Sequence, residues 1–163
     1  MLMACAHRDL RMIQRVISGG QTGVDRAALD VALELGLSCG GWCPHGRQAE
    51  DGPIAPRYPL QETPSADSAQ RTEWNVRDSD GTLLLSRGEL TGGTAWTVEC
   101  AGRFAKPCLI LDLAERPVPE AVRTWALDHQ VRLLNVAGPR ESRSPGIYAQ
   151  AVPFLRAVLG GLP

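Results

Sequence analysis

The chain has 163 residues, 44% of them apolar, and this length fits one globular domain with a sizeable core. Its 17 Lys and Arg residues nearly balance 18 Asp and Glu residues, which disfavours nucleic acid as a partner and favours a small-molecule ligand. No apolar run approaches the ~20 residues that span a bilayer, and the charged N-terminal residues differ from a signal peptide. We therefore expect no membrane partner.

The cysteines point to a reducing environment. The sequence contains five of them, an odd number without paired C-x-x-C spacing. This pattern indicates neither a disulfide framework nor a four-thiolate zinc site, so we predict a cytoplasmic location. Cys43 and His45 are possible metal ligands, but two ligands do not make a zinc site, and we predict no intrinsic metal site.

Apolar runs alternate with segments of helical periodicity after a probable flexible leader over residues 1–13. In chain order, the pattern predicts strands over 15–18, 38–43, 81–86, 107–113 and 131–138, and helices over 25–35, 69–80, 91–105, 119–129 and 144–159. Strands of this kind, nearly continuous in apolar residues and separated by helices, are typical of parallel sheets buried on both faces. We therefore predict an α/β domain of three layers, with a mostly parallel sheet of about five strands flanked by helices.

Residues 44–64 form the longest stretch without a predicted helix or strand. The segment is rich in proline, which forbids a continuous helix or a central strand. Loops of this length in compact domains are usually functional. We expect the loop to shape the rim of a pocket, with Arg47, Glu50 and Asp51 on that rim.

Glycine-rich turns follow three of the predicted strands. The candidate ligand-binding residues in these turns are Gly19, Gly20, Thr22, Gly23, Gly92, Gly93, Thr94, Gly138, Arg140 and Ser142. Glycines allow the backbone to approach a ligand, and the helix that follows offers free N–H groups to an anion. Because ligands of parallel sheets bind at the carboxyl ends of the strands, the three turns predict one phosphate-binding site.

Other interpretations of single residues stay open. Thr22 and Asp25 also fit helix N-terminal caps, and Arg140 also fits a solvated charge. The dinucleotide spacing G-x-G-x-x-G is absent, and no Walker lysine follows the glycines. The predicted ligand is therefore neither ATP nor NAD in their usual binding modes.

Several segments share their pattern with a known family. They include "ISGGQTGVDRAALDVALELG", "GGWCPHGRQAEDGPI", "RTEWNVRDSDGTLLL", "LTGGTAWTVE" and "LNVAGPRESRSPGIY". Together they resemble the putative molybdenum carrier proteins, a small Rossmann-like family within the SLOG superfamily, from about Arg15 to the end of the chain. The resemblance implies a Rossmann-like fold, molybdenum cofactor (molybdopterin) as cargo, and a homo-oligomer.

A more remote resemblance connects residues 71–99 to the Lonely Guy phosphoribohydrolases, which are lysine decarboxylase-like proteins. Thr91 to Glu99 overlays their motif Pro-Gly-Gly-x-Gly-Thr-x-x-Glu, and Arg71 takes the place of their arginine. Thr72 departs from the family by replacing its lysine, and Trp96 replaces the threonine of the motif. This resemblance implies an alternative function, release of a free base from a nucleoside 5′-monophosphate, with Arg71 and Glu99 as catalytic residues.

Two further alternatives remain at the level of the sequence. Arg71 and Glu99 also fit an ion pair on the helix surface, which would contribute little. The domain also fits a sensor that binds a nucleotide and acts through partner proteins, because the sequence does not separate a sensor from a carrier.

Overall fold

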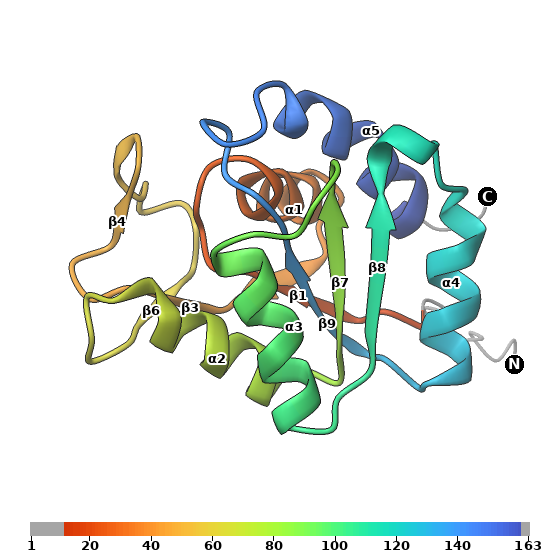
Figure 1. The fold of residues 1–163 in the computed structure, drawn as a ribbon, viewed down its shortest axis with the longest axis horizontal. Helices are drawn as coiled ribbons and strands as arrows, with labels where there is room; N and C mark the ends of the chain where they lie inside the picture. The colour runs from red at the N-terminus through yellow and green to blue at the C-terminus, as the bar shows by residue number, and fades with distance from the viewer. Residues whose placement is uncertain (1–11, 161–163) are drawn as a thin grey trace, which may run out of the picture.

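The computed structural model describes residues 12–160, which are built around a five-stranded parallel sheet (Figure 1). The strands are β1 (Arg15–Ile17), β2 (Ser38–Gly40), β7 (Gly81–Ser86), β8 (Cys108–Asp112) and β9 (Leu133–Ala137). All neighbouring strands are parallel, and their order is β2-β1-β9-β7-β8. Because β9 inserts between β1 and β7, the carboxyl ends of these three strands are adjacent.

Helices cover both faces of the sheet (Figure 1). The helices α1 (Val24–Glu34), α4 (Pro119–Asp128) and α5 (Ile147–Leu159) pack together on one face, and α2 (Ser68–Asp78) packs with α3 (Gly93–Arg103) on the other. A short 3₁₀ helix, η1 (Leu113–Glu115), follows β8. This arrangement confirms the predicted three-layer α/β fold. None of the helices within residues 12–160 is both long and apolar enough to cross a membrane.

The main core lies between the sheet and the helices α1, α4 and α5. All six residues of β7 are buried, as expected for a central strand covered on both faces. Ile13 is also buried in this core, at 7% exposure, although the sequence placed it in a flexible leader. The rest of that leader, residues 1–11, lies outside the described residues.

Two predicted boundaries are wrong for reasons of backbone conformation. The strand predicted over 38–43 is interrupted at Gly41, whose φ is +126°. A Cβ at Gly41 would lie 2.3 Å from the Ser18 carbonyl oxygen, so the chain passes close to β1 and then leaves the sheet. The last helix begins at Ile147 rather than at Ser144, because Gly146 has a left-handed φ of +87°.

Residues 44–64 form an ordered loop with a small core of its own. The strand β3 (Trp42–Cys43) pairs with β6 (Gln61–Glu62), and β4 (Gln48–Ala49) forms a hairpin with β5 (Gly52–Pro53). The core of the loop contains Cys43, Ile54, Tyr58 and Leu60, which pack on Leu29 of α1.

Arg47 organises this loop from within. Its guanidinium donates hydrogen bonds to backbone carbonyls of the same loop, those of Ile54, Ala55, Tyr58 and Leu60. The expectation that Arg47 lies on a pocket rim is therefore corrected, because its charged group is occupied by the loop.

Candidate functional site

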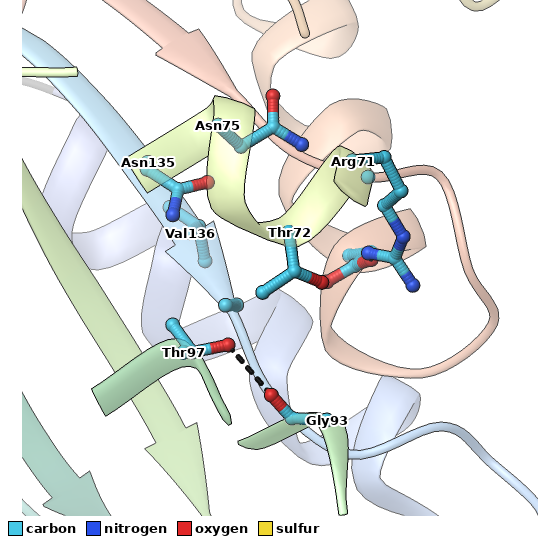
Figure 2. Close-up of a pocket in the computed structure, with 11 residues that line it drawn as sticks. Arg71, Thr72, Asn75, Gly93, Thr97, Asn135 and Val136 are labelled. Carbon is cyan, nitrogen blue, oxygen red and sulfur yellow. Dashed lines mark hydrogen bonds and ion pairs between the residues drawn. The ribbon is translucent and has the colours of Figure 1, made fainter. Parts of the chain in front are cut away.

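A polar cleft lies where the three central strands end. Its enclosed volume is about 30 Å³, and it opens to solvent. Its walls come from the turn after β1, the start of α1, the helices α2 and α3, and the end of β9 (Figure 2). The lining residues are Gly19, Asp25, Arg71, Thr72, Asn75, Gly93, Thr97, Asn135, Val136, Ala137 and Gly138.

Arg71 and Asp25 form a buried ion pair on one wall of the cleft. Arg71 Nη1 lies 3.1 Å from Asp25 Oδ2, and the two side chains are 13% and 4% exposed. Burial raises the pKa of Asp25, although the charge of Arg71 and a hydrogen bond from the Gln21 N–H lower it. A Cβ at Gly19 would lie 1.9 Å from Arg71 Nη1, so glycine at this position leaves room for the guanidinium in its observed place.

The guanidinium of Arg71 is only partly satisfied by the protein. Its Nη1 donates to Asp25, but its buried Nε has no hydrogen-bond partner among the described residues. Buried donors in folded proteins are almost always paired. Arg71 is therefore held at one end by Asp25 and keeps donor capacity beyond that contact.

The other polar side chains of the cleft differ in how far the fold uses them. Asn75 is held by the backbone, because its amide accepts from the Trp42 N–H at 2.8 Å and donates to the Trp42 carbonyl at 3.0 Å. Thr97 Oγ1 donates to the Gly93 carbonyl at 2.8 Å (Figure 2). Asn135 Nδ2 donates to Thr82 Oγ1 at 3.1 Å.

Asp25, Thr72 and Asn135 line the cleft, although the sequence patterns did not predict them as ligand-binding residues. A polar Asn135 inside the apolar run "LLNVA" was an available signal, because buried strands rarely carry an amide without a partner or a ligand. Asp25 was interpreted as a helix cap. In the structure, the N-terminal cap of α1 is Gly23, which makes no side-chain hydrogen bond.

The glycines of the three turns divide into two groups. Gly19, Gly93 and Gly138 line the cleft together with Arg71. Gly20 instead packs on the core of the loop, since a Cβ there would lie 2.6 Å from Leu60 Cδ1. The structure thus brings one glycine of each turn to the cleft.

The other turn residues serve the backbone around the cleft. A Cβ at Gly23 would lie 2.4 Å from the Pro139 carbonyl oxygen, so Gly23 lets the first and third turns touch. Gly92 is the N-terminal cap of α3 with φ +55°. Thr94 Oγ1 donates to the Thr91 carbonyl at 2.8 Å.

Thr22, Arg140 and Ser142 meet around the carboxylate of Glu50 rather than in the Arg71 cleft. Glu50 accepts hydrogen bonds from Thr22 Oγ1, from the Ser142 N–H at 3.1 Å and from Ser142 Oγ at 2.5 Å. Arg140 Nη1 lies 3.9 Å from Glu50 Oε2. Three predicted ligand-binding residues are thus engaged by a side chain of the loop.

Glu99 lies outside the cleft. Its side chain is 55% exposed and accepts a hydrogen bond from Arg103 at 2.7 Å, one helical turn later. Thr97 faces the cleft, and a residue two positions further is rotated by about 200° around the helix. This corrects the expectation that Arg71 and Glu99 share one site, and it gives Glu99 the role of a helix-surface ion pair.

The topology and the position of the cleft define a class of proteins, the doubly wound Rossmann-like α/β proteins, whose ligands bind where the strand order reverses. The model of the Circularly permutated YpsA SLOG family matches residues 16–159, and the chain belongs to this family. This confirms the superfamily that the sequence motifs indicated.

A solved structure supports the same assignment. The putative molybdenum carrier protein from Syntrophus aciditrophicus SB is 46% identical in sequence, with a TM-score of 0.88. The alignment covers 91% of this chain and 96% of that one. No curated protein matches the chain.

Proposed function

We propose that the chain binds a phosphorylated small molecule, a pterin or a nucleotide, in the Arg71 cleft, and that it carries molybdenum cofactor. One observation carries this proposal. The Arg71 guanidinium is fixed by Asp25 at Nη1 but has an unpaired, buried Nε among the described residues, at the ends of the central strands. The Arg71 side chain is 13% exposed, and the remaining N–H groups of its guanidinium can donate charge-assisted hydrogen bonds to a ligand phosphate.

The start of α3 adds a second source of attraction for a phosphate. Gly93 lies at the first turn of this helix and lines the cleft. A Cβ at Gly93 would meet none of the described atoms within 4 Å, so the space above the helix start is open. The first N–H groups of a helix have no partner within it and carry a partial positive charge. A phosphate beside Arg71 would benefit from both.

The polar lining of the cleft suits a phosphorylated heterocycle, whose phosphate and ring edges form hydrogen bonds. The enclosed part of the cleft is small, about 30 Å³, so the ligand also occupies the open space at its mouth. Thr72 and Asn135 on its walls offer a hydroxyl and an amide to the edge of a ring. The 46% identity to a protein named as a putative molybdenum carrier favours the pterin of the molybdenum cofactor over other rings.

A binding function is better supported than phosphoribohydrolase activity. The glutamate that the enzyme hypothesis requires, Glu99, is exposed and paired with Arg103. Among the described residues that line the cleft, Asp25 is the only carboxylate, and it is engaged with Arg71. A carrier needs no general base.

Calorimetric titration tests the proposal. The purified protein is titrated with molybdopterin, with purine nucleoside 5′-monophosphates and with the matching nucleosides that lack phosphate. We expect binding of a phosphorylated ligand, and a loss of about ten-fold or more in affinity in Arg71→Ala, because a hydrogen bond to a charged group is removed. Arg77→Ala is the matched control, since Arg77 lies on the same helix but pairs with Asp78 at the surface.

Two outcomes would overturn the proposal. One is the absence of binding for every phosphorylated ligand in the series. The other is equal affinity in the wild-type protein and in Arg71→Ala. Native mass spectrometry of the freshly purified protein identifies any ligand that co-purifies and thereby names the ring.

A further inference from the structure

We propose that Thr22, Arg140 and Ser142 form a second oxoanion subsite, and that Glu50 is a built-in competitor for it. The subsite is separate from the Arg71 cleft, because none of its residues lines that cleft. It takes a phosphate-type oxoanion. The inference rests on the proposed function only in that both sites accept parts of an anionic ligand, and inorganic anions test it independently.

The donors around Glu50 are those that proteins use for phosphate. Two hydroxyl groups, Thr22 Oγ1 and Ser142 Oγ, and the Ser142 N–H all donate to its carboxylate. The Arg140 guanidinium lies 3.9 Å away. A phosphate presents oxygen atoms of the same charge type and would be recognised by the same donors.

The donors and the carboxylate belong to different parts of the fold. Thr22 lies in the turn after β1, and Arg140 and Ser142 follow β9, so the subsite is assembled at the edge where ligands of such sheets bind. Glu50 comes from the hairpin of β4 and β5 in the proline-rich loop. It therefore enters the subsite from a separate segment of the chain.

The turns hold their geometry through contacts that do not involve the carboxylate. Thr22 Oγ1 also accepts a hydrogen bond from the Glu141 N–H at 3.1 Å, which ties the first turn to the third. Val24 N–H donates to the Pro139 carbonyl, and Gly23 permits this close approach. The subsite thus remains assembled when the Glu50 side chain rotates away.

The hairpin is also held independently of that side chain. The Glu50 N–H donates to Gln21 Oε1 at 2.9 Å, and Asp51 pairs with Arg26 at 3.0 Å. Departure of the carboxylate needs a change of rotamer rather than an opening of the loop. The Glu50 side chain keeps 20% of its surface exposed, so an anion in solvent can reach it.

Glu50 is charged under the conditions in which a phosphate would compete with it. Burial raises its pKa, but hydrogen bonds from Ser142 and Thr22 and the charge of Arg140 outweigh this and lower it below the ordinary value. The subsite therefore contains a carboxylate anion at neutral pH. An incoming phosphate would therefore compete with the Glu50 carboxylate for the same hydrogen-bond donors.

The subsite is connected to the Arg71 cleft by hydrogen bonds through one residue. Gln21 Oε1 accepts from both the Glu50 N–H and the Thr22 N–H, and the Gln21 N–H donates to Asp25. Asp25 in turn holds Arg71. Glu50 thereby restricts which anionic groups of a ligand bind beside the cleft, and it is a specificity-determining residue.

The test compares the binding of inorganic phosphate and pyrophosphate to the full chain with and without Glu50. By calorimetry, we expect Glu50→Ala to bind these anions at least ten-fold more tightly than the wild-type protein. Glu34→Ala removes one negative charge from an exposed position on α1, where Glu34 pairs with Arg156, and it is the control, with no gain expected. Glu50→Gln keeps the size of the side chain, is expected to show a smaller gain, and carries the test if Glu50→Ala does not fold.

Second-site variants assign the gain to one of the two sites. In the Glu50→Ala background, Ser142→Ala should abolish the gain, whereas Arg71→Ala should leave it intact. An unchanged affinity in both Glu50 variants would overturn the inference. So would an equal gain in Glu34→Ala, or a gain that disappears with Arg71 rather than with Ser142. None of these results depends on whether the cleft binds a pterin or a nucleotide.

Discussion

The Arg71 cleft and the Glu50 subsite are built at the same edge of the sheet and from the same kind of turn. They differ in how far a carboxylate of the chain occupies their hydrogen-bond donors. In the cleft, Asp25 engages one end of Arg71 and leaves the buried Nε unpaired among the described residues. In the subsite, Glu50 accepts from every hydroxyl and from the backbone N–H of Ser142. A turn that looks like a phosphate cradle in sequence can therefore be open to a ligand or already filled by the chain.

The largest effect is expected where the two turns touch. Gly23→Ala should lower the free energy of unfolding by about 3 kcal/mol, since its Cβ would lie 2.4 Å from a backbone oxygen and its φ is +80°. Gly36→Ala is the control, because φ is +66° there but no described atom lies within 4 Å, and about 1 kcal/mol is expected. Chemical denaturation measures both. Equal losses would show that the contact between the turns contributes nothing.

A smaller and more selective effect is expected at Gly19. The Cβ of Gly19→Ala would collide with the end of the Arg71 side chain, which can move, rather than with backbone. We expect ligand affinity of the cleft to fall about ten-fold while the free energy of unfolding changes by less than about 1 kcal/mol. Gly102→Ala on α3, with open space around it, should change neither affinity nor stability appreciably. Retained affinity in Gly19→Ala would separate ligand binding from the position of Arg71.

The two carboxylates should give opposite pH dependence. The pKa of Asp25 is raised above 3.8, so its contribution to stability is complete below that value and is lost as the pH rises through its folded pKa. The pKa of Glu50 is lowered below 4.5, so its contribution is present above that value and is lost as the pH falls through its folded pKa.

Denaturation curves at several pH values check these signs. The stability difference between the wild-type protein and Asp25→Asn should decrease with rising pH, and the difference relative to Glu50→Gln should increase. Slopes of the same sign for both variants would contradict the assignment of Asp25 as a carboxylate dominated by burial and of Glu50 as one stabilised by hydrogen bonds.

The smallest effect is expected at the anchor of the loop that carries Glu50. The hydroxyls of Tyr58 and Tyr148 each donate to Asp30 at 2.6 Å, and burial together with Asp30 raises both pKa values to about 12. Tyr58→Phe or Tyr148→Phe should lower stability by about 1 kcal/mol below pH 10. This difference from wild type should vanish as the pH rises from 10 to about 12, where the wild-type hydroxyls ionise. A difference that persists above this range would exclude the hydrogen bonds as its cause.

The sequence predicted the elements of the fold well because hydrophobic periodicity reports burial along each segment. The buried run Gly81–Ser86 and the helix from Pro119 illustrate this. The break at Gly41 escaped prediction, since it follows from the close approach of a distant strand. The homo-oligomer, the cytoplasmic location and the single domain stay predictions from the sequence.

Side-chain partners were predicted less well than positions. Arg71, Gly19, Gly93 and Gly138 were identified from motifs and lie together in the cleft. The structure does not bring Glu99 into the cleft with Arg71, because a motif fixes spacing but not which side of a helix faces the ligand. Asp25 and Glu50 reach Arg71 and Ser142 across 46 and 92 residues of sequence, and such contacts leave no local pattern.

The departure of the chain from the sheet at Gly41 also shortens one edge strand. The strand β2, at one edge of the sheet, is only three residues long. A very short edge strand offers few free backbone groups to a strand of another molecule, and this protects against aggregation by strand addition. The opposite edge strand, β8, is five residues long and carries Ile110 at 43% exposure. Strand addition in a crowded solution would therefore begin at β8, and replacing Ile110 by a charged residue would suppress it.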